Sequence, residues 1–156
     1  MYDEIDYNDG NDFPRDVGIS IEEPSFLNDL TGFDNLELLA SIQNKIGEDD
    51  INKILNIVNL TEEKDKKYKK YSLGMKQKLS LAQAFMKNPK VILLDEPFNG
   101  IDRVSVDKIK SYLLVLKKED VLIIITIHIK DAIVGLCDVL LELEDGKLKD
   151  YEGSKE

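Results

Sequence analysis

The sequence contains a single cysteine, Cys137, among its 156 residues. One cysteine excludes a disulfide bond within the chain and is typical of proteins in a reducing cytosol. Long hydrophobic runs are also missing, because the longest, residues 121–127, is far too short to span a bilayer. Residues 1–10 are acidic and lack the pattern of a signal peptide. We therefore expect a soluble, intracellular protein that needs a partner chain for any role at a membrane.

Positive charge is in short supply. Lysine and arginine total 21 against 31 acidic residues, which gives a net charge of -10. Such a surface repels nucleic acid backbones and anionic lipids, so it argues against DNA or RNA binding by bulk charge. The length and the hydrophobic content of 42% suit one globular domain with a real core.

The spacing of apolar residues changes along the chain. The first half has helical periodicity, and the second half has continuous apolar runs that are typical of strands buried in a parallel sheet. Strands that alternate with helices predict an α/β fold with right-handed crossovers. We expect an α/β core from residues 1–29 and 76–156, and an inserted helical region at 30–75. The predicted strands are 16–21, 90–95, 120–128 and 138–143, the helices are 34–46, 49–58, 76–87, 104–116 and 129–136, the charged linker is 62–70, and a hairpin covers 144–151.

Two adjacent carboxylates follow the first continuous apolar run. Asp95 ends the predicted strand and Glu96 comes next. At the carboxyl edge of a parallel sheet, where ligands gather, Asp95 can hold Mg²⁺ and Glu96 can polarise a water molecule. The alternative is that the two residues only begin a loop.

The one histidine, His128, ends the next apolar run. If both strands are parallel, its imidazole lies in the same crevice as Glu96 and can donate a hydrogen bond to a phosphoryl oxygen. A purely structural role is the common alternative for a lone histidine.

A glycine turn precedes the helix predicted at 76–87. Ser72 and Gly74 lie next to a helix N-terminus, whose free amides and dipole favour phosphate. The alternative is ordinary capping by Ser72, with Lys76 and Lys78 on a solvated face.

In their order along the chain, these segments resemble the ATP-binding subunits of ABC transporters. The resemblance covers nearly the whole chain and is closest to exporters of the bacitracin and lantibiotic resistance kind. It implies a partial P-loop NTPase fold with a mostly parallel sheet and an inserted α-helical subdomain. The matching segments are "YSLGM" at 71–75 with the signature motif, "VILLD" at 91–95 with Walker B, "NGID" at 99–102 with the D-loop, and His128 with the H-loop.

Three residues depart from the usual family pattern. Leu73 replaces a signature glycine, Met75 replaces the signature glutamine, and Glu22 stands in place of the Q-loop glutamine. All three variants are similar to those of the same exporter subgroup, so they favour that subgroup within the family. Glu22 leaves open whether a glutamine-type contact to Mg²⁺ and water is made.

The resemblance implies that ATP is sandwiched between two subunits arranged head to tail. Asp95 holds Mg²⁺ through water, Glu96 is the general base, and His128 contacts the γ-phosphate. The loop at residues 22–30 senses a transmembrane permease at the inner face of the cell membrane. The resemblance assigns cofactor contacts to Ser72, Leu73, Gly74, Met75, Glu22 and Asp102, and gives Asp102 a role in communication across the dimer.

The phosphate-binding loop that this chemistry requires is missing from these residues. No G-x-x-x-x-G-K-[ST] occurs, and the lone Gly-Lys pair, Gly146-Lys147, is followed by Leu148. We expect a domain of residues 1–156 that is truncated at its N-terminus, exposes apolar strand surface and has a marginal or self-associating fold. We also expect it neither to bind ATP tightly nor to hydrolyse it alone.

The sequence favours a subunit of an export transporter. Two alternatives remain. One is a non-catalytic partner that offers its signature face to a complete subunit. The other is an ABC-type ATPase outside transport, which would need a tandem domain or long coiled coils.

Overall fold

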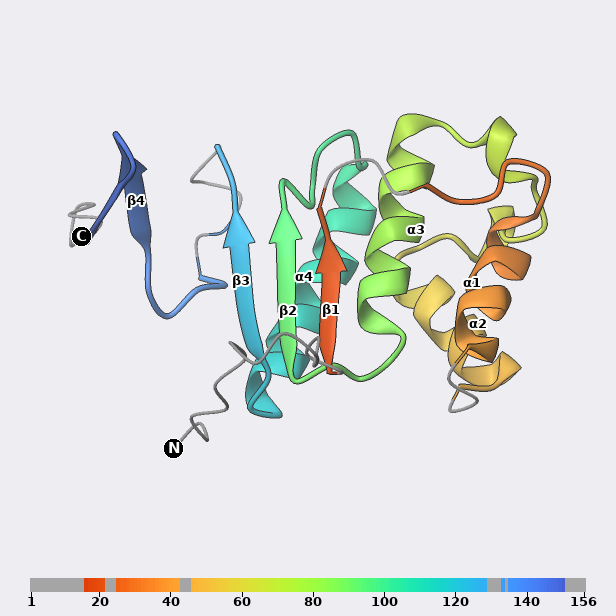
Figure 1. The fold of residues 1–156 in the computed structure, drawn as a ribbon, viewed down its shortest axis with the longest axis horizontal. Helices are drawn as coiled ribbons and strands as arrows, with labels where there is room; N and C mark the ends of the chain where they lie inside the picture. Colours follow the sequence, from red (N-terminus) through yellow and green to blue (C-terminus); the bar gives the residue numbers. More distant parts are fainter. Residues whose placement is uncertain (1–15, 22–24, 43–45, 129–132, 134, 151–156) are drawn as a thin grey trace, which may run out of the picture.

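A three-stranded sheet, a separate hairpin and a group of helices form the part of the chain that is described (Figure 1). The computed structural model describes residues 16–21, 25–42, 46–128, 133 and 135–150. In chain order the elements are β1 (Val17–Ser20), α1 (Gly32–Ser41), α2 (Glu48–Ile57), η2 (Thr61–Glu63), η3 (Tyr68–Lys70), α3 (Leu73–Phe85), β2 (Val91–Asp95), α4 (Arg103–Lys118), β3 (Leu122–Thr126), β4 (Leu141–Glu144) and β5 (Lys147–Asp150).

The main sheet is parallel, as predicted, with the strand order β1-β2-β3. One face carries the fully buried Ile92 and the nearly buried Leu94, and helices α3 and α4 cover it (Figure 1). Helix α3 lies directly on β1, because a Cβ atom on Gly18 would be 2.0 Å from the carbonyl oxygen of Ala84. The side chains of β2 therefore lie at the centre of the core. The end of β2 fixes the position of Glu96, which follows it.

The opposite face of this sheet is partly exposed within the described residues. Leu122 is 41% exposed and Ile124 is 49% exposed, and within the described residues β3 pairs only with β2. The expectation of exposed apolar strand surface is confirmed, whereas the expectation that β3 is buried on both faces is wrong. An edge strand has a neighbour on one side only and leaves its outward residues in solvent.

The strand predicted at 138–143 does not join the parallel sheet. Its last three residues belong to β4, which pairs antiparallel with β5 in a two-stranded sheet, so the hairpin prediction is confirmed. Asp145 and Gly146 have φ values of 49° and 74°. Positive φ at both central residues is the type I′ turn that hairpins prefer, and it fixes the local pairing of β4 with β5.

The helices of the first half share one buried cluster with α3. Leu36 of α1, Leu55 of α2 and Leu79 of α3 are fully buried. A capping box at Thr31 starts α1 at Gly32, and the helix ends at Ser41. Residues 43–45 of the helix predicted at 34–46 lie outside the described residues. The linker predicted at 62–70 is partly ordered, since it contains η3 and parts of η2.

Helix α3 begins earlier than predicted. Its first residue is Leu73, because Ser72 is the N-cap and its Oγ accepts a hydrogen bond from the amide of Met75. The turn at residues 72–75 is therefore the first turn of the helix. Most of the helix predicted at 129–136 lies outside the described residues.

Candidate nucleotide site

The ends of β2 and β3 bring the predicted carboxylates together. Asp95 pairs in register with Thr126, whose hydroxyl donates a hydrogen bond to Asp95 Oδ1. The next residue, Glu96, has a φ of 44°, and its amide donates to the carbonyl of Thr126 at 3.0 Å. This left-handed backbone is uncommon for residues other than glycine, and it turns the chain sharply after the strand. We call Asp95, Glu96, Thr126 and His128 the carboxylate edge.

Glu96 and His128 lie close together at this edge. The Nε2 atom of His128 is 3.4 Å from Oε1 of Glu96. The Glu96 side chain is 21% exposed, whereas that of His128 is 93% exposed. The predicted proximity of the two residues is therefore confirmed. A half-buried carboxylate next to an accessible imidazole is suited to orienting a water molecule and a phosphoryl group.

The carboxylate edge fits one half of a magnesium site. Asp95 is exposed, and Mg²⁺ commonly binds one or two carboxylates together with phosphate oxygens and water. Among the described residues no group of three or more histidine, cysteine, aspartate or glutamate side chains is placed to hold a metal ion. The donor set therefore suits an ion that takes its remaining ligands from a nucleotide and water.

The glycine turn, residues 72–75, packs against the loop at residues 99–102. A Cβ atom on Gly74 would be 2.3 Å from the carbonyl oxygen of Gly100, so the two backbones are in direct contact. Gly100 has a φ of 70°, which favours glycine at that position. Ser72 and Leu73 are exposed, with Leu73 at 61%. The turn thus presents Ser72 and Leu73 to solvent from a rigid support.

Asp102 caps α4 instead of extending freely into solvent. Its Oδ1 accepts from the amide of Ser105 at 2.9 Å, and its Oδ2 accepts from Ser105 Oγ at 2.7 Å. Lys78 Nζ is 2.8 Å from the same Oδ2. These contacts, that of Lys78 first, lower the pKa of Asp102 well below its ordinary range. The carboxylate is therefore charged at neutral pH.

The residues that support Asp102 were not predicted. The alternative interpretation puts Lys78 on a solvated face, but its side chain is only 10% exposed. Ser105 is fully buried, and Asn59 Nδ2 donates to its Oγ at 3.0 Å. The sequence feature that could have indicated this support is Lys78, a cation one helical turn after the glycine turn. Glu22, a predicted contact, lies outside the described residues.

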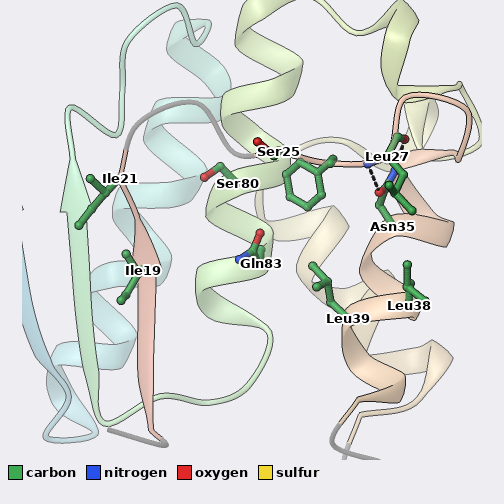
Figure 2. A pocket seen from close by; sticks show the side chains of 10 residues that line it. Ile19, Ile21, Ser25, Leu27, Asn35, Leu38, Leu39, Ser80 and Gln83 are labelled. Carbon is green, nitrogen blue, oxygen red and sulfur yellow. Dashed lines mark hydrogen bonds between the residues drawn. The ribbon is translucent and has the colours of Figure 1, made fainter. Parts of the chain in front are cut away.

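A cavity of about 360 Å³ lies between β1, α1 and α3 (Figure 2). Asn35 holds one of its walls, because its side chain accepts from the amide of Leu27 at 2.8 Å and donates to the Leu27 carbonyl at 3.1 Å. Ser80 and Gln83 of α3 contribute polar groups, and α1 contributes leucines. The cavity borders the described part of the loop predicted to sense a membrane subunit. Within the described residues, no helix is both long and apolar enough to cross a bilayer.

Comparisons with known proteins agree with this geometry. The family model described as ABC transporter matches residues 2–99, more than half of the chain. The bacitracin transport ATP-binding protein BcrA of Enterococcus faecalis is 39% identical over 133 residues, which are 85% of this chain and 43% of that protein. The lantibiotic transport ATP-binding protein SrtF of Streptococcus pyogenes is 33% identical over 144 residues, which are 90% of this chain and 62% of that protein. The chain thus spans about half of each of these relatives.

Solved structures share the fold at low sequence identity. The dimeric structure of MJ0796, described as a bacterial ABC transporter cassette, has a TM-score of 0.75 at 19% identity, covering 88% of this chain and 64% of that one. A second MJ0796 structure, a post-hydrolysis state bound to ADP and Pi, has a TM-score of 0.74. The fold is therefore the partial P-loop NTPase fold that the resemblance predicted. The chain belongs to the ABC transporter family.

Proposed function

We propose that this chain is part of an ATP-binding subunit that couples ATP hydrolysis to export through a membrane partner. The observation that carries the proposal is the joint presence of the carboxylate edge and the glycine turn in one fold. Relatives named for bacitracin and lantibiotic transport support the export role.

At the carboxylate edge, Asp95, Glu96 and His128 have different roles in ATP hydrolysis. ATP bound with Mg²⁺ supplies the phosphoryl group that is transferred to water. Asp95 would hold the ion through water, and the hydroxyl of Thr126 orients its carboxylate. Glu96 accepts the proton of the attacking water, and His128, 3.4 Å away, donates to a phosphoryl oxygen.

The glycine turn serves a nucleotide held mainly by a second ATP-binding subunit. The exposure of Ser72 and Leu73 at a helix N-terminus supports contact with phosphate from outside the chain. Gly74 and Met75 complete the contact surface, and the dimeric form of MJ0796 supports a head-to-tail pair. Asp102 then lies next to the dimer interface.

We propose that a transmembrane permease is the second partner. The loop at 22–30 and the cavity beside Asn35 form the contact surface, with Glu22 at its start. This arrangement puts the chain at the cytoplasmic side of a membrane that it reaches only through its partner. It also divides the chain into a core of 1–29 and 76–156 and a helical subdomain of 30–75. Nucleic acid is not among the proposed partners.

The 156 residues by themselves are proposed to be inactive. A positioned general base contributes about 10²–10⁴-fold to a rate. The loss of even one preorganised donor costs about 10²–10³-fold, and the whole phosphate loop with its lysine is missing from this sequence. Glu96 cannot offset that loss.

A second candidate is a non-catalytic partner that offers its glycine turn to a complete subunit. The close packing of the turn on the loop at 99–102 favours it, because residues of this chain support the turn. Both candidates predict pairing with a complete subunit, and they differ in whether Glu96 is needed.

Mixing the chain with a complete ATP-binding relative tests both candidates. We expect wild-type chain to change the ATPase rate of the relative, and Ser72→Arg to abolish the change by blocking the nucleotide contact. Ser111→Arg on the exposed side of α4 is the matched control and should behave as wild type. If wild-type chain neither stimulates nor inhibits the relative, pairing is refuted. A change that persists in Ser72→Arg refutes the role of the turn.

A further inference from the structure

Lys78 is a nearly buried cation one helical turn after the glycine turn. The whole residue is 8% exposed, and lysine is rarely buried to that degree without a partner. Its Nζ is 2.8 Å from Asp102 Oδ2 and donates to the carbonyl of Asn59 at 3.4 Å. Lys78 therefore connects α3 to the start of α4 and to the end of α2.

The partners of Lys78 are themselves fixed. Asp102 accepts two hydrogen bonds from Ser105, and Ser105 Oγ accepts one from Asn59 at 3.0 Å. Lys108 Nζ donates to Asn59 Oδ1 at 2.9 Å. Asn59 has a φ of 57°, a conformation that asparagine tolerates better than most residues. The ammonium group thus enters a network that ties three helices together.

Residues 72–75 and the loop at 99–102 also touch directly. A Cβ atom on Gly74 would be 2.3 Å from the carbonyl oxygen of Gly100, so these two backbones are in contact. The Lys78–Asp102 pair is a second connection between the same two segments, because Lys78 follows the turn in α3 and Asp102 ends the loop. Any displacement of one loop must then displace the other or break the pair.

We propose that Lys78 is a positioning residue that makes the glycine turn and the loop at 99–102 move as one unit. The inference rests on the proposed function, because the unit matters to catalysis only if the turn contacts a nucleotide. The loop at 99–102 begins three residues after Glu96. The Lys78–Asp102 pair therefore links the position of the chain's own general base to the face offered to the second subunit.

The ion pair contributes more to position than to global stability. Asp102 is 54% exposed, and ion pairs in contact with water contribute little to folding. The aliphatic stem of Lys78 packs against the core, and methionine can fill the same space. Lys78→Met is therefore expected to fold, and Lys78→Arg keeps the charge.

Hydrogen exchange of the full chain, in the absence of nucleotide, measures how firmly the turn and the loop at 99–102 are held together. We expect Lys78→Met to raise the exchange rate of amides in residues 72–75 and 99–102 by about tenfold, in proportion to losing a charged hydrogen bond. Lys78→Arg should restore slow exchange in both loops. The matched control is Lys117→Met, which breaks the 2.6 Å pair with Asp138 near the other end of α4 and should leave both loops unchanged.

Two results would overturn the proposed role of Lys78. One is an unchanged amide exchange rate in both loops of Lys78→Met. The other is an increase in exchange rate that is equal along the whole chain. The mixing assay with a complete relative separates this inference from the proposed function. If Ser72→Arg abolishes the effect on the relative but Lys78→Met leaves its maximal rate intact, positioning fails while the proposed function stands. Loss of the effect in Lys78→Met with recovery in Lys78→Arg supports the inference.

Discussion

The glycine turn is supported by a lysine whose side chain is 10% exposed, whereas the carboxylate edge ends in a histidine whose side chain is 93% exposed. The turn is held by backbone contact, a helix cap and a partly buried network of side chains. The side chains of the edge are held by the hydroxyl of Thr126 and by a contact of 3.4 Å between Glu96 and His128, in addition to the backbone pairing of β2 with β3. The chain's own residues therefore fix the turn more firmly than they fix the side chains of the carboxylate edge.

The largest effect should come from adding one carbon atom to the turn. In Gly74→Ala the new Cβ would be 2.3 Å from the carbonyl oxygen of Gly100, so one backbone must move. We expect a loss of about 2–3 kcal/mol in the free energy of unfolding, measured by urea denaturation. Gly47→Ala is the control, because nothing lies within 4 Å of its added carbon, and it should cost about 0.5 kcal/mol through the N-cap of α2. Equal losses in both variants would show that the turn is not closely packed.

The next effect tests the network below the turn. Ser105→Ala removes a fully buried hydroxyl that bonds both Asp102 and Asn59, and leaves the Asn59 amide without that acceptor. We expect a loss of about 1–2 kcal/mol in unfolding free energy. Ser111→Ala changes an exposed serine of the same helix and should cost under about 0.5 kcal/mol. If the two serines behave alike, the network contributes nothing to the rigidity of the turn.

A third prediction concerns Tyr71, which precedes the turn. Its hydroxyl donates to the carbonyl of Glu63 at 2.9 Å, and burial raises its pKa from 10.0 to about 12. Because the folded state favours the neutral phenol, the stabilisation is complete below pH 10 and is lost as the pH rises to about 12. Tyr71→Phe should lose about 1 kcal/mol at pH 8 and show a shallower alkaline decline than wild type in urea titrations between pH 8 and 12. Parallel declines would contradict the account.

The smallest effect should appear at the carboxylate edge. His128→Gln changes a side chain that is 93% exposed, so the free energy of unfolding should shift by less than about 0.5 kcal/mol. Thermal melts of the variant and of wild type at the same chain concentration provide the measurement. A loss as large as that of Ser105→Ala would show that the edge is as organised as the turn, and the contrast between them would disappear.

The sequence predicted the parallel sheet and the convergence of Asp95, Glu96 and His128, because continuous apolar runs that end in polar residues have few other arrangements. It misplaced residues 138–143, since β propensity identifies a strand but not its partner, and the turn at Asp145 and Gly146 decides the pairing locally. The burial of Lys78 was also missed. A lysine in a charged stretch of sequence is usually solvated, and only the fold shows that Asp102 at the start of α4 is its partner.

Calorimetric titration of MgATP into the purified chain tests most directly whether the carboxylate edge is only half of a site. The account predicts no binding at micromolar concentrations and no turnover, because the carboxylate edge lacks a phosphate cradle within these residues. A micromolar Kd, together with ATP hydrolysis that Glu96→Gln abolishes, would contradict it.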